Sequence, residues 1–369
     1  MTRTVLAVNA GSSSLKYGLY PADGPALWTG QAEGLEAAGE AGFQAALQRL
    51  LERIADSGAE LLAVSHRIVH GGGLCTAPCR LDAALLARLR TLEPLAPLHQ
   101  PHNLDGVEAF ARALPGLPQV GCFDTAFHAT LPAVERQLPI DRTLAAQGLR
   151  RYGFHGLSYQ FLADTLPAHS ARAGGRVLMA HLGNGASLCA VRGGRSVATT
   201  MGFSALDGLM MGTRSGSLDP GVLLHLLRQG WDAARLERLL YQGSGLKGVS
   251  GLSADMRTLR ASEAPEAAEA IALFTHRVLR EAGALSAVLG GLDALVFTGG
   301  IGEHDAVLRA DLVGGLAHLG LALDPAANAA ARGDAVLPVH APHSAAEVWV
   351  VPTDEGRVAA RAAFALLGG

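Results

Sequence analysis

The chain has 369 residues, a formal net charge of −3 and 49% hydrophobic residues. This length is enough for two domains with substantial cores, so a single small binding module is an unsuitable description. The near-neutral charge gives no general electrostatic reason to bind nucleic acid or an anionic membrane, and no stretch of 18 uninterrupted apolar residues predicts a membrane span.

The amino-terminal residues and the four cysteines give information about the cellular compartment of the protein. The amino terminus lacks the apolar core of a secretory signal peptide, so we expect a soluble cytoplasmic protein. Cys75 and Cys79 are four positions apart, but no second pair follows at the spacing of a zinc site. Cys122 and Cys189 lie in apolar, strand-like runs, which is typical of buried free thiols.

The first half of the chain predicts a hairpin followed by helices and strands. An apolar strand at Val5–Val8 and a second strand at Leu15–Tyr20 flank the polar turn Asn9–Ser14, which indicates a β-hairpin. An amphipathic helix, a buried strand, two more helices and a further strand follow at about residues 33–55, 61–64, 81–90, 102–113 and 119–123. Asp124 stands at the end of the last of these strands.

The second half repeats the opening plan. A strand at 177–182, a turn at Gly183–Gly185 and a returning strand at 186–191 predict another polar hairpin, so we expect two related halves with a cleft between them. A long amphipathic helix, a buried strand, a last strand and a carboxy-terminal helix follow at about 265–289, 294–298, 348–351 and beyond 355. Mixed strands alternating with helices predict the α/β class.

Three glycine-rich turns each follow an apolar strand, at residues 9–14, 183–187 and 299–303. Such turns let backbone N–H groups converge on phosphate oxygens, although a single one often does no more than end a strand. Three in one chain favour a nucleotide site. Lys16, one of two lysines in the chain, follows the first turn, but the turn lacks the second glycine and the Ser/Thr of a Walker A loop.

Charged residues stand beside these turns. Arg67 comes at the end of an apolar strand and Arg214 lies in a glycine-flanked loop, where a guanidinium can clamp carboxylate or phosphate. His155, in the sequence RRYGFHG, is equally well explained as a structural histidine. Asp124 and Glu355 follow strands, and such carboxylates suit Mg²⁺ near phosphates, although helix capping is a competing explanation for the segment around Glu355.

Taken together, the motifs resemble the acetate kinase family, which includes propionate and butyrate kinases, within the actin-like and sugar-kinase-like ATPase superfamily. The matching strings cover nearly the whole chain in order: VNAGSSSLKY, HRIVHGG, PLAPLHQP, FDTAFH, RRYGFHG, HLGNGAS, MGFSALDGLMMGTRSGSLDPG, SGLSADMR, FTGGIGE and PTDE. Each string is modest alone, but ten in register make the resemblance specific.

The resemblance implies an α/β fold of two ribonuclease-H-like domains with mixed sheets flanked by helices and the active site in the interdomain cleft. The implied boundaries are residues 1–124 plus 357–369 for the amino-terminal lobe and 125–356 for the nucleotide-binding lobe. The implied activity is the reversible transfer of the γ-phosphoryl group of ATP to acetate, giving acetyl phosphate and ADP. Mg²⁺ is the implied metal, with Mn²⁺ as the alternative, and the implied assembly is a homodimer.

The resemblance also assigns residues to roles. Asn9 and Glu355 are expected at the metal. Contacts to ATP are expected from Lys16, His181, Leu182, Gly183, Asn184, Gly185, Asp255, Met256, Arg257, Gly300, Ile301, Gly302, Glu303 and His304. Arg67 would bind the acetate carboxylate, and Val69, Leu98 and Phe154 would line the pocket for its methyl group. Asp124, His155 and Arg214 are the expected catalytic residues.

The chemistry of these residue types agrees with that assignment. A carboxylate nucleophile is already ionised at neutral pH, so no strong base is needed to activate it. The remaining tasks are to offset the repulsion between two anions and to stabilise charge on the phosphoryl oxygens, which suits arginine, histidine and Mg²⁺ in a direct in-line transfer. We therefore interpret Asp124 as an orienting or electrostatic residue rather than a base.

Several positions depart from the family pattern and leave alternatives open. Ala205 stands where the family usually has proline, which should widen the acyl pocket and keeps a propionate or short-chain acyl kinase as an alternative. Further departures are Ser217, Lys247, His304 and Gly356. A switching ATPase related to actin or Hsp70 remains a more remote alternative, and a sugar kinase suits the site less because its neutral hydroxyl nucleophile would need a base.

Overall fold

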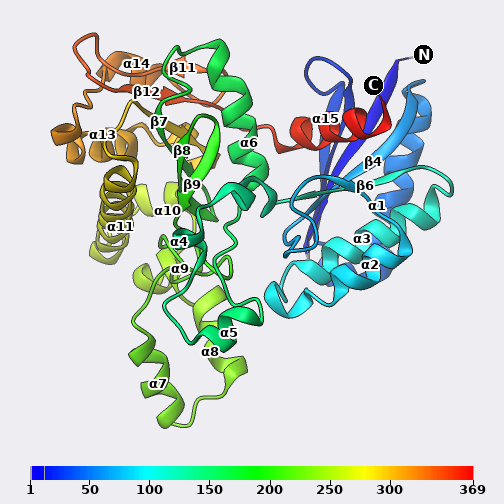
Figure 1. The fold of residues 1–369 in the computed structure, drawn as a ribbon, viewed down its shortest axis with the longest axis horizontal. Helices are drawn as coiled ribbons and strands as arrows, with labels where there is room; N and C mark the ends of the chain where they lie inside the picture. Colours follow the sequence, from blue (N-terminus) through cyan, green and yellow to red (C-terminus); the bar gives the residue numbers. More distant parts are fainter. Residues whose placement is uncertain (1, 12, 369) are drawn as a thin grey trace. The chain divides into compact units, whose positions relative to one another are not determined.

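The computed structural model describes residues 2–11 and 13–368, so Ser12 of the first polar turn lies outside the described residues. The chain forms two compact units (Figure 1). Unit 1 consists of Met1–Ala129, Gly156–Phe161 and Asp354–Gly369, and unit 2 of Thr130–His155 and Leu162–Thr353. Compared with the expected boundaries, unit 1 also takes in residues 125–129, 156–161 and 354–356.

Unit 1 is built on a six-stranded mixed sheet in the order β3-β2-β1-β4-β6-β5. Its strands are β1 (Arg3–Ala10), β2 (Ser14–Pro21), β3 (Trp28–Glu33), β4 (Glu60–Ile68), β5 (Cys79–Arg80) and β6 (Gln119–Phe123). Strands β1, β2 and β3 run antiparallel as a meander, whereas β4 pairs in parallel with β1 on one side and with β6 on the other. The predicted first hairpin is therefore confirmed.

Unit 2 is built on a second six-stranded sheet in the order β11-β12-β10-β7-β8-β9. Its strands are β7 (Arg176–Leu182), β8 (Ala186–Arg192), β9 (Arg195–Thr199), β10 (Ala294–Thr298), β11 (Leu337–Pro338) and β12 (Glu347–Val350). Read from the β9 edge, the order repeats that of unit 1 strand for strand. The antiparallel meander, the two parallel strands and the short antiparallel edge strand recur as well. The prediction of two related halves is confirmed.

Helices cover the sheets and connect the strands. Those named in unit 1 are α1 (Leu35–Asp56), α2 (Ala83–Arg90), α3 (Gln100–Ala113) and α15 (Glu355–Leu367). Unit 2 contains α4 (Ala133–Arg136), α5 (Arg142–Ala146), α7 (Pro220–Arg228), α8 (Ala233–Gln242), α9 (Gly245–Ser250), α10 (Met256–Arg260), α11 (Pro265–Leu289), α12 (Gly299–His304), α13 (Ala306–Gly315) and α14 (Pro325–Ala330). Helix α6 (Gly156–Thr165) begins in unit 1 and ends in unit 2.

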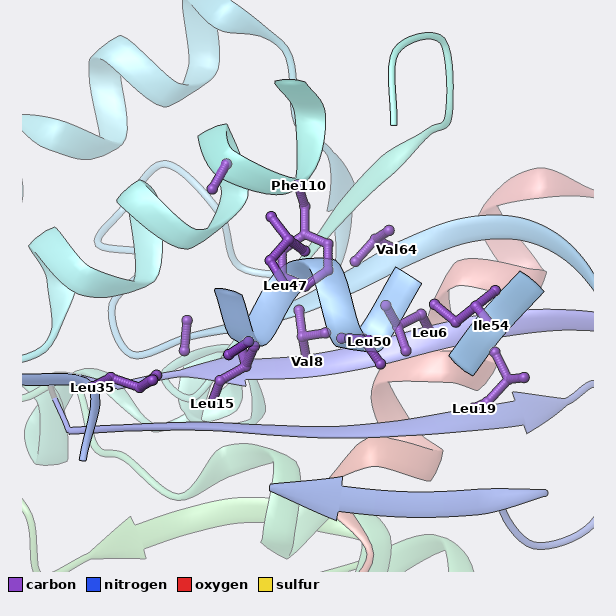
Figure 2. Close-up of a cluster of buried hydrophobic side chains, with 13 residues drawn as sticks. Leu6, Val8, Leu15, Leu19, Leu35, Leu47, Leu50, Ile54, Val64 and Phe110 are labelled. Carbon is purple, nitrogen blue, oxygen red and sulfur yellow. The ribbon is translucent and has the colours of Figure 1, made fainter. Parts of the chain in front are cut away.

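The core of unit 1 lies on both faces of its sheet. On one face, Leu6 and Val8 of β1 contact α1 through Leu47 and Leu50, and Phe110 of α3 joins this cluster (Figure 2). On the other face, alternate residues of β1, β4 and β6 pack against α15. Side chains alternate between the two faces of a strand, and here both faces of the central strands are covered. Neighbouring residues such as those of β1 are therefore both buried, which explains why these strands are continuous apolar runs in the sequence.

Two predictions about single features can be compared with the structure. Cys122 in β6 and Cys189 in β8 are buried free thiols, as predicted. The helix expected at about 33–55 is present as α1, but Gly39 inside it has a non-helical conformation with φ of 60°, so the helix is interrupted there. Among the described residues, no helix is both long enough and apolar enough to cross a membrane.

One buried histidine couples the fold of unit 1 to pH. His66 of β4 is 2% exposed and shares a 2.7 Å hydrogen bond through Nε2 with Oε1 of Gln119. Burial lowers the pKa of His66 to about 4, although the bond to Gln119 acts in the opposite direction. The unfolded chain takes up this proton near pH 6.5, whereas the folded chain does so only near pH 4. Stability from this group is therefore complete above pH 6.5 and is lost as the pH falls toward 4.

We predict that His66→Gln reduces the loss of unfolding free energy between pH 7 and pH 4.5 by as much as about 3 kcal/mol, because glutamine does not titrate. Urea-induced unfolding of both proteins at the two pH values measures the effect. An unchanged difference between the two pH values in the variant would contradict this prediction.

Candidate active site

The site in unit 1 is centred on an ion pair at the carboxyl ends of two neighbouring strands. Arg67 lies at the end of β4, and Asp124 directly follows β6, its parallel neighbour. Arg67 donates to both carboxylate oxygens of Asp124, from Nε at 3.0 Å and from Nη2 at 2.5 Å. Asp124 is 1% exposed, so this bidentate pair fixes the direction of the guanidinium.

Two further oxygen atoms lie beside the same guanidinium. Asn9, near the end of β1, accepts a hydrogen bond from Nη1 of Arg67 at 3.3 Å, and Oε2 of Glu355 lies 3.5 Å from Nε. Burial alone would lower the pKa of Arg67, but the attraction of Asp124 and Glu355 outweighs it and holds that pKa above its ordinary value. Arg67 is therefore a permanent positive charge within a cluster of three oxygen-bearing side chains.

The competing explanation for the segment around Glu355 can now be resolved. Helix α15 is capped by Asp354, whose side chain accepts a hydrogen bond from the backbone N–H of Arg357 at 3.0 Å. Asp354 also accepts a 2.7 Å hydrogen bond from the hydroxyl of Tyr20. The capping role thus belongs to Asp354, and the carboxylate of Glu355 faces Arg67.

Unit 1 contains a hollow of about 450 Å³. The residues that line it include the predicted site residues Asn9, Lys16, Arg67 and Glu355. Lys16 of β2 is exposed and pairs in register with Asn9 of β1, so both side chains lie on the same face of the hairpin. Of the residues expected around the methyl group, Val69 is buried and Leu98 is half-buried in unit 1, while Phe154 is buried in unit 2.

The same hollow explains one departure from the family pattern. Gly356 stands where the family usually has a second acidic residue. A Cβ atom on Gly356 would overlap the hydroxyl group of Tyr20, which also lines the hollow. Glycine at 356 therefore accommodates the ring of Tyr20, and the hydroxyl of that ring is bound to the cap of α15.

The oxygen donors of unit 1 fit a magnesium ion. Mg²⁺ binds in proteins through one or two carboxylates, with water and phosphate oxygens filling its remaining positions. Glu355 supplies a carboxylate and Asn9 an amide oxygen in the wall of one hollow. Over residues 2–11 and 13–368, no group of three or more His, Cys, Asp or Glu side chains is arranged to hold a metal ion.

In unit 2, the second and third glycine-rich turns meet. Strands β7 and β10 are parallel neighbours, so the turn after Leu182 and the start of α12 at Gly299 lie at the same edge of the sheet. The backbone nitrogen of Gly300 is 3.7 Å from the position that a Cβ atom on Gly183 would occupy. Gly212 also donates from its backbone to the carbonyl of Asn184 at 3.0 Å, which brings the loop containing Arg214 to the same turn.

A cavity of about 1070 Å³ in unit 2 adjoins these turns. Its walls contain eight of the residues predicted to contact ATP, namely Gly183, Asn184, Asp255, Met256, Arg257, Gly300, Ile301 and His304. Ala254, Ala261 and Val307 add apolar surface suited to an aromatic base. Asp255 also caps α10 and forms an ion pair with Arg257 at 2.5 Å.

Three of the residues expected at ATP are buried in this structure. Leu182 is fully buried in β7 and Gly302 is buried in α12. Oε1 of Glu303 accepts hydrogen bonds from Oγ1 of Thr298 at 3.1 Å and from the backbone N–H groups of Gly299 at 2.8 Å and Thr353 at 3.2 Å. The carboxylate of Glu303 therefore braces the third turn from inside and ties it to the segment that leads to Glu355.

Next to the second turn lie the predicted catalytic residues His155 and Arg214. Nη2 of Arg214 and Nε2 of His155 are 2.9 and 3.1 Å from the point where a Cβ atom on Gly185 would stand. The ring of His155 stacks on that of His181 with a centroid distance of 4.2 Å, and Nη1 of Arg214 donates to the carbonyl oxygen of Ala205 at 2.6 Å. Two cationic or proton-bearing groups thus converge on a glycine turn.

The sequence reasoning missed several residues that hold these groups in place. Arg309 is fully buried and donates to the carbonyl oxygens of Gly302 and Glu303 at 2.9 and 2.8 Å, so it braces the far end of α12. Ser217, a departure from the family pattern, donates to Asp207 at 2.7 Å within the loop that holds Arg214. No periodic or spacing signal marks these residues, because Arg309 binds carbonyl oxygens of the preceding helix and Ser217 binds a side chain elsewhere in its own loop.

The repeated sheet topology and the polar turns at equivalent strand ends define the two-domain actin-like ATPase fold. The model of the acetokinase family matches residues 29–361, and the chain belongs to that family. An acetate kinase from Rhodopseudomonas palustris (strain ATCC BAA-98 / CGA009) is 55% identical over 312 residues, which are 84% of this chain and 78% of the relative.

Solved structures agree with this assignment. The crystal structure of Porphyromonas gingivalis acetate kinase matches with a TM-score of 0.89 at 33% identity, over 99% of this chain and 100% of that one. A propionate kinase from Francisella tularensis subsp. tularensis SCHU S4 matches with a TM-score of 0.90 at 32% identity, over 98% of both chains.

We predict that Glu303→Ala destabilises the protein by about 3 kcal/mol or more, because two buried donors and one partly buried donor lose their acceptor. Glu303→Gln is the matched control, since its carbonyl oxygen can still accept, and it should lose less than half as much. Urea-induced unfolding followed by tryptophan fluorescence measures both. Equal losses in the two variants would contradict the bracing role of this carboxylate.

Proposed function

We propose that the chain is an acetate kinase that transfers the γ-phosphoryl group of ATP to acetate and catalyses the reverse reaction. Family membership and the names of the relatives support this proposal. The observation that carries it is the orientation of the Arg67 guanidinium. The buried carboxylate of Asp124 fixes that orientation at the carboxyl ends of two neighbouring strands. A fixed planar guanidinium matches a small carboxylate substrate in a bidentate fashion.

Unit 1 would bind the acceptor. Arg67 would pair with the carboxylate of acetate, and Val69 and Leu98, with Phe154 of unit 2, would contact the methyl group. Because acetate is ionised at neutral pH, its oxygen attacks the γ-phosphorus without a base. The P–O bond to ADP breaks as the bond to the acetate oxygen forms, in line and with no phosphoenzyme. Asp124 orients Arg67 and takes no proton.

Unit 2 would bind the nucleotide and stabilise the transition state. The cavity lined by Asp255–Arg257 and Gly300–His304 would take the nucleoside, and backbone N–H groups of the turn at Gly183–Gly185 would meet the phosphates. His155 and Arg214 would place positive or hydrogen-bonding groups on the equatorial phosphoryl oxygens, where charge develops during the transfer. Lys16 of unit 1 would add a compact ammonium group to the phosphates.

Magnesium would be held by Glu355 and Asn9 together with phosphate oxygens of ATP, with Mn²⁺ as an alternative ion. When bound, the ion neutralises charge on the phosphates. On the acceptor side, Arg67 would hold acetate, and Asp124 would keep the orientation of that guanidinium. We also place the enzyme in the cytoplasm, where ATP is available.

A homodimer is part of the proposal. Helix α7 has no buried residue, and exposed apolar side chains gather on it and just before it, at Leu218, Val222, Leu224 and Leu227. Exposed apolar side chains gathered on one short segment favour association with a second copy of the chain. A monomeric molar mass in light scattering would contradict this part of the proposal.

Propionate is a second candidate acceptor. Ala205 replaces the usual proline and is half-buried. Its carbonyl oxygen accepts a hydrogen bond from Arg214, so the residue that differs is in direct contact with a predicted catalytic group. A propionate kinase is also among the solved structures that match. One methylene changes discrimination by about 1–3 kcal/mol, so a modest widening of the pocket is enough to admit it.

The main test is the formation of acyl hydroxamate from ATP, Mg²⁺, hydroxylamine and each of formate, acetate, propionate and butyrate. We expect hydroxamate with acetate, and with propionate at a kcat/KM within about tenfold of the acetate value, in line with the small energy of one methylene. ATP hydrolysis without hydroxamate would overturn the proposed function. A preference for acetate of several hundredfold would remove only the widened pocket.

We predict that Asp124→Asn lowers kcat/KM for acetate by about a hundredfold or more. Asparagine can accept from only one of the two Arg67 donors, and it removes the nearer of the two carboxylates that pair with the guanidinium, so the guanidinium is no longer fixed in direction. Steady-state kinetics at varied Mg²⁺ concentrations measures the loss. Full activity with the normal dependence on Mg²⁺ would contradict the role of Asp124.

A further inference from the structure

The hairpins of the two units match, and the match places Ser187 of unit 2 at the position that corresponds to Lys16 of unit 1. In unit 1, Asn9 of β1 pairs with Lys16 of β2, one residue pair before the turn. In unit 2, the equivalent pair is His181 of β7 and Ser187 of β8, again one pair before the turn. Ser187 therefore occupies the place in unit 2 that Lys16 occupies in unit 1, with its side chain on the same face as His181.

Ser187 is fully buried, and its Oγ atom lies 2.7 Å from Nδ1 of His155. His155 is held in two further ways. Its ring stacks on His181 at 4.2 Å, and its backbone has φ of 59°, the left-handed conformation, which no other described non-glycine residue adopts. A residue in this sparsely populated region persists only where its surroundings determine it.

The hydrogen bond to Ser187 engages one of the two ring nitrogens of His155. With Nδ1 facing Ser187, Nε2 faces the glycine turn, 3.1 Å from the point where a Cβ atom on Gly185 would stand and close to Nη2 of Arg214. A serine hydroxyl that donates to Nδ1 leaves the proton of a neutral imidazole on Nε2. Nε2 then presents an N–H donor to the turn.

We propose that Ser187 is a positioning residue for His155. It fixes both the orientation of the ring and the nitrogen that carries the proton, so that Nε2–H is directed at the anionic ligand of the turn. The role of that donor in phosphoryl transfer rests on the proposed function. The hydrogen bond to Nδ1 and its effect on the proton position hold whether or not acetate is the acceptor.

The proposal separates Ser187 from serines that only support the fold. Ser286 of α11 is also buried, and its hydroxyl donates to the carbonyl of Ala282 within its own helix at 2.7 Å. It lies outside the groups assigned to the site, so Ser286→Ala removes a buried hydroxyl of unit 2 without touching His155. It serves as the matched control for Ser187→Ala.

The first measurement is the ¹⁵N chemical shift of the His155 ring in the full-length protein at neutral pH, assigned by comparison with His155→Ala. We expect a proton on Nε2 in the wild type and in Ser286→Ala, and a mixture of tautomers in Ser187→Ala. A neutral ring with its proton on Nδ1 in the wild type, or an unchanged spectrum in Ser187→Ala, would overturn the proposal. Neither result depends on turnover.

The second measurement is a double-mutant cycle on kcat. Ser187→Ala should lower kcat by about tenfold or more while the KM values for acetate and ATP change little, because a misdirected donor affects the transition state above all. In the His155→Ala background the same change should have almost no further effect. Equal losses in both backgrounds would show that Ser187 acts through the fold, and would overturn the proposal. If the shifts behave as expected but no acyl phosphate forms, the proposed function fails and the positioning role stands.

Discussion

The pair formed by Arg67 and Asp124 is the constraint on which unit 1 depends. A carboxylate that is 1% exposed is stable only with a charged, well-aligned partner, and Arg67 supplies two hydrogen bonds to it. The pair forms because β4 and β6 are parallel neighbours whose ends lie side by side. The guanidinium thereby faces Asn9 and Glu355, so one electrostatic requirement of the fold also brings together the residues of the proposed acceptor site.

Unit 2 solves a similar problem with backbone groups in place of an ion pair. Its turns at Gly183–Gly185 and Gly299–Gly300 meet because β7 and β10 are parallel neighbours, and both lie beside the large cavity. Around them the charged residues work mostly through backbone atoms: Glu303 accepts from two N–H groups, and Arg309 and Arg214 donate to carbonyls. A site of this kind is stiff where phosphates would bind.

How far the sequence could predict this structure depended on the range of the interactions. The helix at about 265–289 and the strands at about 119–123 and 294–298 follow from local sequence patterns, and the structure confirms all three. The repeated hairpins also predicted two related halves, which the strand orders confirm. Glu303 shows the limit, because its three hydrogen-bond donors include Thr353, fifty positions away, and no local pattern reveals that the carboxylate turns inward. The short edge strands β5 and β11 were missed for the same reason, since each is defined by its partner strand.

Helix α15 has a consequence for the order in which the protein can fold during synthesis. The helix belongs to unit 1, where Ala359, Ala360, Ala363 and Phe364 cover one face of the sheet, yet all of unit 2 precedes it in the chain. A ribosome releases the strands of unit 1 first and the helix that covers them last. That sheet face, with its apolar side chains, therefore lacks α15 while about two hundred residues are translated, which takes on the order of ten seconds or more at the usual rates of synthesis. Unit 2, by contrast, can complete its sheet before α15 emerges, so the second unit along the chain is the first able to fold.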